Sequence, residues 1–146
     1  DPDAIATRTA TPRDAVAISA IIEHYVPVGT LLPRSPEYVA EHAADFVVAE
    51  RGGRVVGCVH LDDYAPSLAE VRSLAVSPTA QAGGVGARLV QALEALARRR
   101  SYATLFAVSN NDAFFRRLGY VERHIPELDR ERSAVSRFKG VYAKDL

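Results

Sequence analysis

Hydrophobic residues recur along the chain in two spacings, which predict an alternation of short strands and helices. Between residues 85 and 99 leucines and valines recur every three or four positions, which places them on one face of a helix. Valine-rich runs at 46–50 and 54–61 are typical of strands instead. The predicted strands cover 5–9, 46–50, 54–61, 70–76, 102–108, a stretch that begins at 120, and 140–143; the predicted helices cover about 11–25, a stretch that begins at 35, 85–99 and 112–118.

Residues that typically begin or end helices and strands lie at the predicted boundaries of these elements. Ser35 followed by Pro36 provides a capping hydroxyl and a proline at a helix start. Gly119 suits a helix C-cap, and Gly52 with Gly53 suits the turn of a β-hairpin. The order βααβββαβαββ predicts an α+β fold in a single domain over 1–146, with a central mixed, mostly antiparallel sheet and helices on both faces.

The charge balance gives no sign of a nucleic-acid or membrane partner. The 18 Lys and Arg residues equal the 18 Asp and Glu residues, so no net field draws the chain to a polyanion or to an anionic membrane. No apolar run approaches the length of a membrane span. The expected partner is therefore a small molecule, and a homodimer is left open.

Cys58 is the only cysteine of the chain, which excludes an intrachain disulfide and favours a reducing compartment. It lies in the apolar run 55–59, so a small core residue is favoured over a reactive thiol. The N-terminus has no signal-peptide pattern, and the chain begins with Asp1 rather than Met, which suggests trimming. We expect a cytoplasmic protein.

The segment after the strand at 70–76 carries the clearest chemical signal. Glycines at 83, 84 and 86 precede the amphipathic helix. They let the backbone turn tightly and present several N–H groups at the positive end of a helix dipole, which suits a phosphate or pyrophosphate. The alternative is a turn that only links strand to helix. The pattern is not a P-loop, and Leu89 stands where a dinucleotide fingerprint needs its third glycine.

Two adjoining motifs carry a resemblance to a known family. The strand end Leu74-Ala75-Val76-Ser77-Pro78 is followed by the pattern Gln/Arg-x-x-Gly-x-Gly/Ala, here from Gln81 to Gly86. In this combination the sequence resembles the GNAT superfamily of N-acetyltransferases. The resemblance implies acetyl-CoA as co-substrate and a splayed strand pair that receives it. The implied CoA contacts are Leu74, Ala75 and Val76 for pantetheine, Gln81, Ala82, Gly83, Gly84, Val85, Gly86 and Ala87 for the pyrophosphate, and Phe114 and Phe115.

The resemblance also implies two catalytic groups on the strand at 70–76. Glu70 stands where many GNAT enzymes have a general base, which an amine needs because it is mostly protonated at neutral pH. The Val76 N–H would stabilise the oxyanion that develops when a thioester is attacked. The alternative for Glu70 is a structural ion pair with Arg72. No nucleophile for a covalent intermediate is evident, so we expect direct attack in a ternary complex.

A narrower resemblance, to the short N-acetylglutamate synthases, covers most of the chain from Leu31 onward. The motifs are Leu31-Leu32-Pro33-Arg34-Ser35, Asp45-Phe46-Val47-Val48-Ala49-Glu50, Val56-Gly57-Cys58, Ala69-Glu70-Val71-Arg72-Ser73-Leu74-Ala75-Val76 and Phe114-Phe115-Arg116-Arg117-Leu118-Gly119-Tyr120. This resemblance implies acetyl transfer to the α-amine of L-glutamate, the entry step of arginine biosynthesis. Arg34, Arg72 and Arg137 would bind the dicarboxylate. The tail at 138–140 departs from the family pattern.

Phe115 stands where the wider superfamily often has a tyrosine that protonates the departing thiolate. A phenyl ring cannot do so, and a thiol pKa of about 8.5 allows the thiolate to leave unprotonated or to be protonated by water or another group. Two rival functions stay open: a GNAT enzyme for another amino acid, a polyamine or a protein N-terminus, and a non-catalytic CoA-binding sensor. The four histidines show no metal-ligand spacing, so no metal is expected. His60 is a candidate for a polar site residue.

Overall fold

The computed structural model describes residues 3–29, 31–129 and 139–146. The chain divides into two compact units, which we call unit 1 (1–62 with 71–93) and unit 2 (63–70 with 94–146). The chain passes from one unit to the other within β3 (Arg54–Ala65), β4 (Leu68–Val76) and α3 (Val85–Arg99). The prediction of a single domain stays a prediction.

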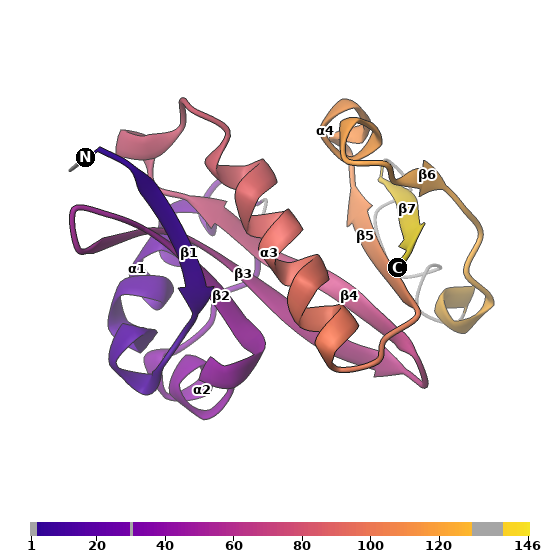
Figure 1. The fold of residues 1–146 in the computed structure, drawn as a ribbon, viewed down its shortest axis with the longest axis horizontal. Helices are drawn as coiled ribbons and strands as arrows, with labels where there is room; N and C mark the ends of the chain where they lie inside the picture. Colours follow the sequence, from indigo (N-terminus) through magenta and orange to yellow (C-terminus); the bar gives the residue numbers. More distant parts are fainter. Residues whose placement is uncertain (1–2, 30, 130–138) are drawn as a thin grey trace. The chain divides into compact units, whose positions relative to one another are not determined.

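The order of elements is the predicted one (Figure 1). The remaining strands are β1 (Ile5–Thr9), β2 (Phe46–Arg51), β5 (Thr104–Ser109), β6 (Val121–Glu122) and β7 (Gly140–Asp145); the remaining helices are α1 (Ala15–Tyr25), α2 (Pro36–Glu41) and α4 (Asp112–Arg117), with 3-10 turns η1 (Pro12–Asp14), η2 (Ala43–Asp45), η3 (Pro78–Ala80) and η4 (Pro126–Leu128). Several strand bounds differ from those predicted; β4, for example, begins at Leu68 rather than at Glu70, and β7 continues to Asp145 rather than ending at Ala143. β3 continues to Ala65 because the tight turn at Ser67, whose φ is +63°, comes later than the apolar pattern indicates, and β5 begins at Thr104 rather than at Tyr102.

The strands form a mixed, mostly antiparallel sheet, as predicted. Their hydrogen-bonded order is β1-β2-β3-β4-β5-β7-β6. Within unit 1, β1 pairs antiparallel with β2 and β2 with β3. Within unit 2, β7 pairs antiparallel with β5 and with β6. The one parallel ladder in the described chain joins Leu68–Glu70 of β4 to Thr104–Phe106 of β5, so the rest of β4, up to Val76, lies beyond it.

The core of unit 1 lies between α1, α2 and one face of its strands. Ile18 and Ile22 of α1 and Val39 of α2 are fully buried there. They form one cluster with Phe46 of β2 and Cys58 of β3. Burial raises the pKa of the Cys58 thiol to about 12, which confirms that this cysteine is a core residue.

The first half of α3 covers the opposite face of the unit 1 strands. Gly57 is next to Cys58 in β3, so it faces the other side. A Cβ at Gly57 would lie 2.9 Å from Cδ1 of Leu89 and 3.2 Å from the carbonyl oxygen of Ala75. The missing side chain therefore lets α3 approach the sheet closely. Helices on both faces, as predicted, are present in unit 1.

Unit 2 has its own apolar cluster, which includes Phe106 of β5 and Val141 of β7. It also contains a buried polar network. The Tyr120 hydroxyl donates to a carboxylate oxygen of Glu94 at 2.8 Å, and Lys144 Nζ lies 3.2 Å from the other oxygen. Glu94 is almost fully buried. Because a buried carboxylate is costly without partners, this network explains how the second half of α3 tolerates it.

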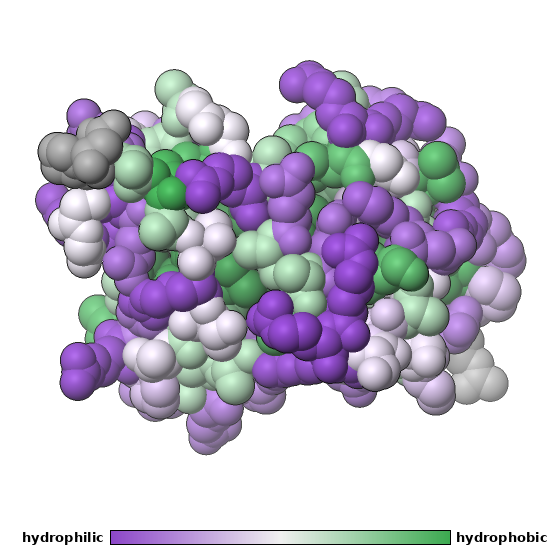
Figure 2. Space-filling model, in the orientation of Figure 1, coloured by the Kyte–Doolittle hydropathy of each residue, from purple (hydrophilic) through white to green (hydrophobic). Residues whose placement is uncertain are grey.

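Exposed large apolar side chains are few among the described residues and come from separate segments. They are Val16 in α1, Val28 and Leu32 in the loop after it, and Val121 in β6. On the face drawn in Figure 2, hydrophobic areas are small and interrupted by hydrophilic side chains. None of the described helices combines the length and the apolar character that a membrane crossing requires.

Candidate functional site

The carbonyl of Val76, the last residue of β4, is held by two side chains. The Tyr25 hydroxyl, at the end of α1, donates to it. Gln81 Nε2 also donates to it at 2.7 Å and lies 2.5 Å from the Tyr25 oxygen. These three residues fix the end of β4 against α1 and the start of the glycine loop.

The Val76 N–H points away from β3. The N–H of Ser77 donates to the Val56 carbonyl at 2.8 Å, which directs it toward β3. Successive N–H groups along an extended strand point to opposite sides, so the preceding N–H points the other way. Ser73 interrupts the strand shortly before, with a φ of +54° in the left-handed region. Such a residue is typical of a β-bulge, which re-aims the backbone next to a site.

The glycine loop leads directly into the N-terminus of α3. Gly83 and Gly84 have φ values of +98° and +74°, and no atom lies within 4 Å of the position that a Cβ would take at either. The Gly84 carbonyl accepts the first helical hydrogen bond, from the Arg88 N–H at 3.1 Å. The N–H groups of Val85 to Ala87 therefore have no acceptor within the helix. A 15-residue helix and open space above its first turn suit an anion.

Glu70 and Arg72, the two charged residues of β4, have different surroundings. Glu70 is half-buried and lies opposite Phe106 in the parallel ladder of unit 2. Arg72 Nη1 lies 3.2 Å from Asp62 Oδ2 of β3, and both side chains are about a third exposed. Arg72 is thus partly neutralised by a carboxylate on its neighbouring strand.

Arg34 lies in unit 1 just before α2. Its guanidinium lies over the Tyr38 ring, 5.1 Å from the ring centroid, and Nη1 donates to the Pro33 carbonyl at 3.1 Å. Its Nε is buried and has no hydrogen-bond partner among the described residues. A buried donor of a charged group without an acceptor is costly, so an incoming acceptor would be bound favourably at Arg34.

His60 of β3 is buried in unit 1, 2% exposed, and its ring stacks on Phe46 with centroids 4.3 Å apart. Burial lowers its pKa to about 4, so the ring is neutral at physiological pH. Its Nδ1 has no hydrogen-bond partner among the described residues. The His42 ring lies 6.1 Å away, which sequence spacing did not indicate.

Phe115 packs in the core of unit 2, where its ring lies against Tyr120 and Tyr142. Phe114 is partly exposed and contacts Phe115 edge to face. Phe115, which lacks the hydroxyl of the tyrosine often found at this position, is therefore part of a buried aromatic cluster.

The predicted site residues divide between the units. Unit 1 contains Leu74, Ala75 and Val76, the loop residues Gln81, Ala82, Gly83, Gly84, Val85, Gly86 and Ala87, and Arg34 and Arg72; unit 2 contains Glu70, Phe114 and Phe115. Arg137 lies outside the described residues. Tyr25, which the sequence analysis did not single out, joins the unit 1 group through its hydroxyl. A tyrosine at the end of a helix carries no signal by which it could have been chosen.

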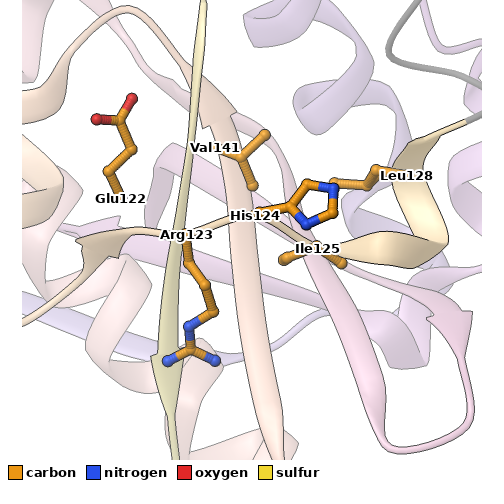
Figure 3. Close-up of a pocket in the computed structure, with 6 residues that line it drawn as sticks. All are labelled: Glu122, Arg123, His124, Ile125, Leu128 and Val141. Carbon is orange, nitrogen blue, oxygen red and sulfur yellow. The ribbon is translucent and has the colours of Figure 1, made fainter.

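A pocket of about 310 Å³ lies in unit 2, and none of the predicted site residues lines it. It is lined by Glu122, Arg123, His124, Ile125, Leu128 and Val141 (Figure 3). The carboxylate of Glu122 and the guanidinium of Arg123 point in different directions, and His124 Nε2 lies 2.7 Å from Asp129 Oδ1. The polar groups do not converge on one point, so the pocket lacks the character of a catalytic site.

The strand end, the glycine loop and the helix start define a class of protein. Residues 42–122 match the acetyltransferase (GNAT) domain, and the chain belongs to this family. It is therefore a GNAT acetyltransferase domain.

Comparison with individual proteins shows which members of the family the chain is similar to. The chain is 42% identical over 115 residues to an uncharacterized N-acetyltransferase of Chlorobaculum tepidum, covering 79% of this chain and 74% of that protein. It is 36% identical over 132 residues to an amino-acid acetyltransferase of Neisseria meningitidis, covering 87% of this chain and 30% of that protein. The chain thus spans less than a third of the length of this longer relative.

Two solved structures agree with this placement. The N-acetylglutamate synthase of Neisseria gonorrhoeae, complexed with coenzyme A and N-acetyl-glutamate, has a TM-score of 0.85 and 33% identity, covering 98% of this chain and 35% of that chain. A Mycobacterium tuberculosis protein complexed with CoA has a TM-score of 0.82 and 25% identity, covering 97% of this chain and 99% of that chain.

Proposed function

We propose that the protein transfers the acetyl group of acetyl-CoA to the α-amine of L-glutamate, the reaction of an N-acetylglutamate synthase in arginine biosynthesis. The observation that carries the choice of acceptor is the buried, unpartnered Nε of Arg34. A carboxylate is the acceptor that a guanidinium fork binds best. The named relatives support the same choice.

The residues of the glycine loop fit the pyrophosphate of CoA. The space above Gly83 and Gly84 is open, and the α3 N-terminus offers N–H groups of Val85, Gly86 and Ala87 at the positive end of its dipole. Gln81, predicted to contact the pyrophosphate, also holds the Val76 carbonyl with its side chain and so shapes the loop. The end of β4, at Leu74–Val76, lies beyond the β4–β5 ladder and would receive pantetheine along its backbone.

Each group of the chain then has a chemical task. Glu70 takes the proton of the attacking ammonium, directly or through water. The Val76 N–H donates to the oxygen on which charge develops, and Tyr25 with Gln81 holds the following peptide through the Val76 carbonyl. Phe115 donates no proton, so the thiolate leaves without help from this position.

Substrate recognition rests mainly on Arg34. Arg72 already has Asp62 as its partner, so it contributes less net attraction to a substrate carboxylate. The guanidinium of Arg34 is pre-oriented by its contact with Tyr38, which lowers the entropy lost on binding. The role of Arg137 stays a proposal from the resemblance.

A substrate panel tests the proposal. The chain is incubated with acetyl-CoA and one amine at a time, namely glutamate, aspartate, glutamine, leucine, lysine or spermidine, and released CoA thiol is measured. We expect glutamate to give the highest kcat/KM, and Arg34→Ala to lose this preference while Arg54→Ala, at an exposed arginine of β3, keeps it. Preference for a cationic or apolar amine would contradict the choice of glutamate and leave the acetyltransferase standing. Tight CoA binding without turnover on any amine would favour a sensor.

A further inference from the structure

Three side chains that commonly bind metals meet in unit 1, apart from the residues assigned to acetyl transfer. His42 follows α2, Asp45 ends η2, and His60 lies in β3. We propose that His42, Asp45 and His60 bind one divalent transition-metal ion. This proposal does not rest on the proposed acetyl transfer.

The distances are those of a site that needs a small closure. One ligand atom of each residue lies within 4.8 Å of the others, and His42 Nδ1 is 3.8 Å from Asp45 Oδ2. Ligands at about 2.1 Å from a tetrahedral ion are about 3.4 Å apart. Closure thus shortens the longest of these separations by at most about 1.4 Å. The side chains of His42 and Asp45 are 41% and 35% exposed, which leaves them room to move.

His60 is the member of the set whose ring is held in place by its neighbours, and one of its ring nitrogens lacks a hydrogen-bond partner among the described residues. Its ring is held between Phe46, stacked at an interplanar angle of 3°, and Tyr38, in edge contact. Its Nδ1 is buried without a partner among the described residues. A neutral imidazole coordinates a metal through one nitrogen while the other carries the proton. A buried, rigid imidazole therefore supplies an anchor to which the two more exposed ligands close.

The surrounding charges admit a cation. Asp45 is itself a member of the set, and its Oδ2 lies 3.8 Å from His42 Nδ1, so its negative charge is available to a bound ion.

The ligand chemistry selects the class of metal. Two imidazoles and one carboxylate suit Zn²⁺, Co²⁺, Ni²⁺ or Cu²⁺, whereas Mg²⁺ and Ca²⁺ prefer oxygen ligands. A fourth position is left for water or an added ligand. The sequence did not reveal this set because 18 positions separate His42 from His60 and only the fold brings α2 next to β3.

Titration of the untagged chain with CoCl₂ and ZnCl₂ tests the site. We expect one ion per chain by calorimetry and visible d–d absorption with Co²⁺. His60→Gln and His42→Gln should each weaken binding at least tenfold. His124→Gln is the matched control, because His124 also lies beside an aspartate but belongs to no such three-residue set in the described chain, and it should leave binding unchanged.

If His60→Gln does not fold, His42→Gln alone tests the metal site. The His42 side chain is 41% exposed, so its replacement is expected to leave the fold intact. Circular dichroism checks the fold of each variant. Absence of stoichiometric binding, binding that survives both His42→Gln and His60→Gln, or binding lost in His124→Gln would each overturn the proposal. Metal binding is measured directly on the chain without acetyl-CoA or an amine, so the outcome does not depend on the proposed function.

Discussion

The hydroxyl of Tyr25 donates to the main-chain carbonyl of Val76, across 51 positions of sequence. Gln81 donates to the same oxygen and lies next to the same hydroxyl. One carbonyl at the end of β4 thus joins α1 to the loop that precedes α3. The end of β4, where the Val76 N–H is proposed to point at the reacting thioester, is therefore held through the following peptide by side chains from α1 and from the loop.

Replacing Tyr25 with phenylalanine removes one of these donors and keeps the ring. We expect the free energy of unfolding to fall by about 1 kcal/mol, because one hydrogen bond is lost while Gln81 still satisfies the carbonyl. Because the end of β4 at Val76 is held less firmly, kcat/KM should fall by about tenfold. Denaturant unfolding and steady-state kinetics measure the two effects. A variant with normal kcat/KM would show that Tyr25 only stabilises the fold.

Gly84 and Gly53 form a matched pair for testing the CoA loop. Their φ values are +74° and +76°, and neither has an atom within 4 Å of its missing Cβ. Valine should therefore strain the backbone similarly at both positions, by about 1 to 2 kcal/mol. We expect Gly84→Val to weaken CoA binding at least tenfold in calorimetry and Gly53→Val to leave it unchanged. Equal CoA affinity in the two variants would argue against the loop as the pyrophosphate site.

Glu70→Gln keeps the shape of the side chain and removes its ability to accept a proton. The rate at saturating substrates should fall by about two to four orders of magnitude, while CoA affinity changes little. Glu37→Gln, at an exposed position of α2, serves as the control. Single-turnover kinetics isolates the chemical step. A decrease of only a few fold would leave Glu70 a structural residue, and water would be the base.

Arg34→Ala should raise the KM for glutamate by about 10- to 150-fold, which corresponds to the loss of a charge-assisted hydrogen bond of about 1.5 to 3 kcal/mol. The KM for acetyl-CoA should remain within about twofold. Arg34→Lys should restore little, because an ammonium lacks the planar fork. Arg72→Ala is expected to have a smaller effect, since Asp62 already neutralises that side chain. The reverse order of the two arginines would reassign the carboxylate contact to Arg72.

Asp14 gives the stability of unit 1 a pH dependence. Its carboxylate accepts two hydrogen bonds from Arg8, at 2.8 and 2.9 Å, and this pairing lowers its pKa below the ordinary value of 3.8. A lowered pKa in the folded state means that the contribution is present above about pH 4 and is lost as the pH falls through the folded value. We expect Asp14→Asn to be less stable than wild type at pH 7 and the difference to shrink at pH 3, as measured by urea unfolding. A constant difference would exclude the linkage.

The sequence was sufficient for the order of elements, because the signals are local. The helical face of α3 is an example: Val85, Leu89, Leu93 and Leu96, predicted to share one face, are all buried. The positive φ of Gly119 likewise confirms the C-cap read from the sequence. Where bounds moved, the apolar pattern was not specific enough: β3 continues past its apolar run to the turn at Ser67, over residues that are partly buried or exposed.

The part of the candidate site that is a contiguous sequence motif could be predicted. The contacts that the fold makes between distant residues could not. The loop 81–86 could be found because glycine positions relate directly to backbone shape. The bond between Tyr25 and Val76, and the pairing of Arg72 with Asp62, depend on strand register and on helix placement. No spacing in the sequence encodes either contact.

Cys58 gives the chain an internal reporter of its own opening. Its thiol is fully buried, donates to the Ser73 carbonyl at 3.4 Å, and has a strongly raised pKa. A maleimide or disulfide reagent therefore reacts with it only when the core between the helices and the sheet of unit 1 opens, and labelling rates measure that opening under native conditions. The same inaccessibility means that a thiol-detecting assay registers released CoA with almost no background from the protein, for as long as the protein stays folded.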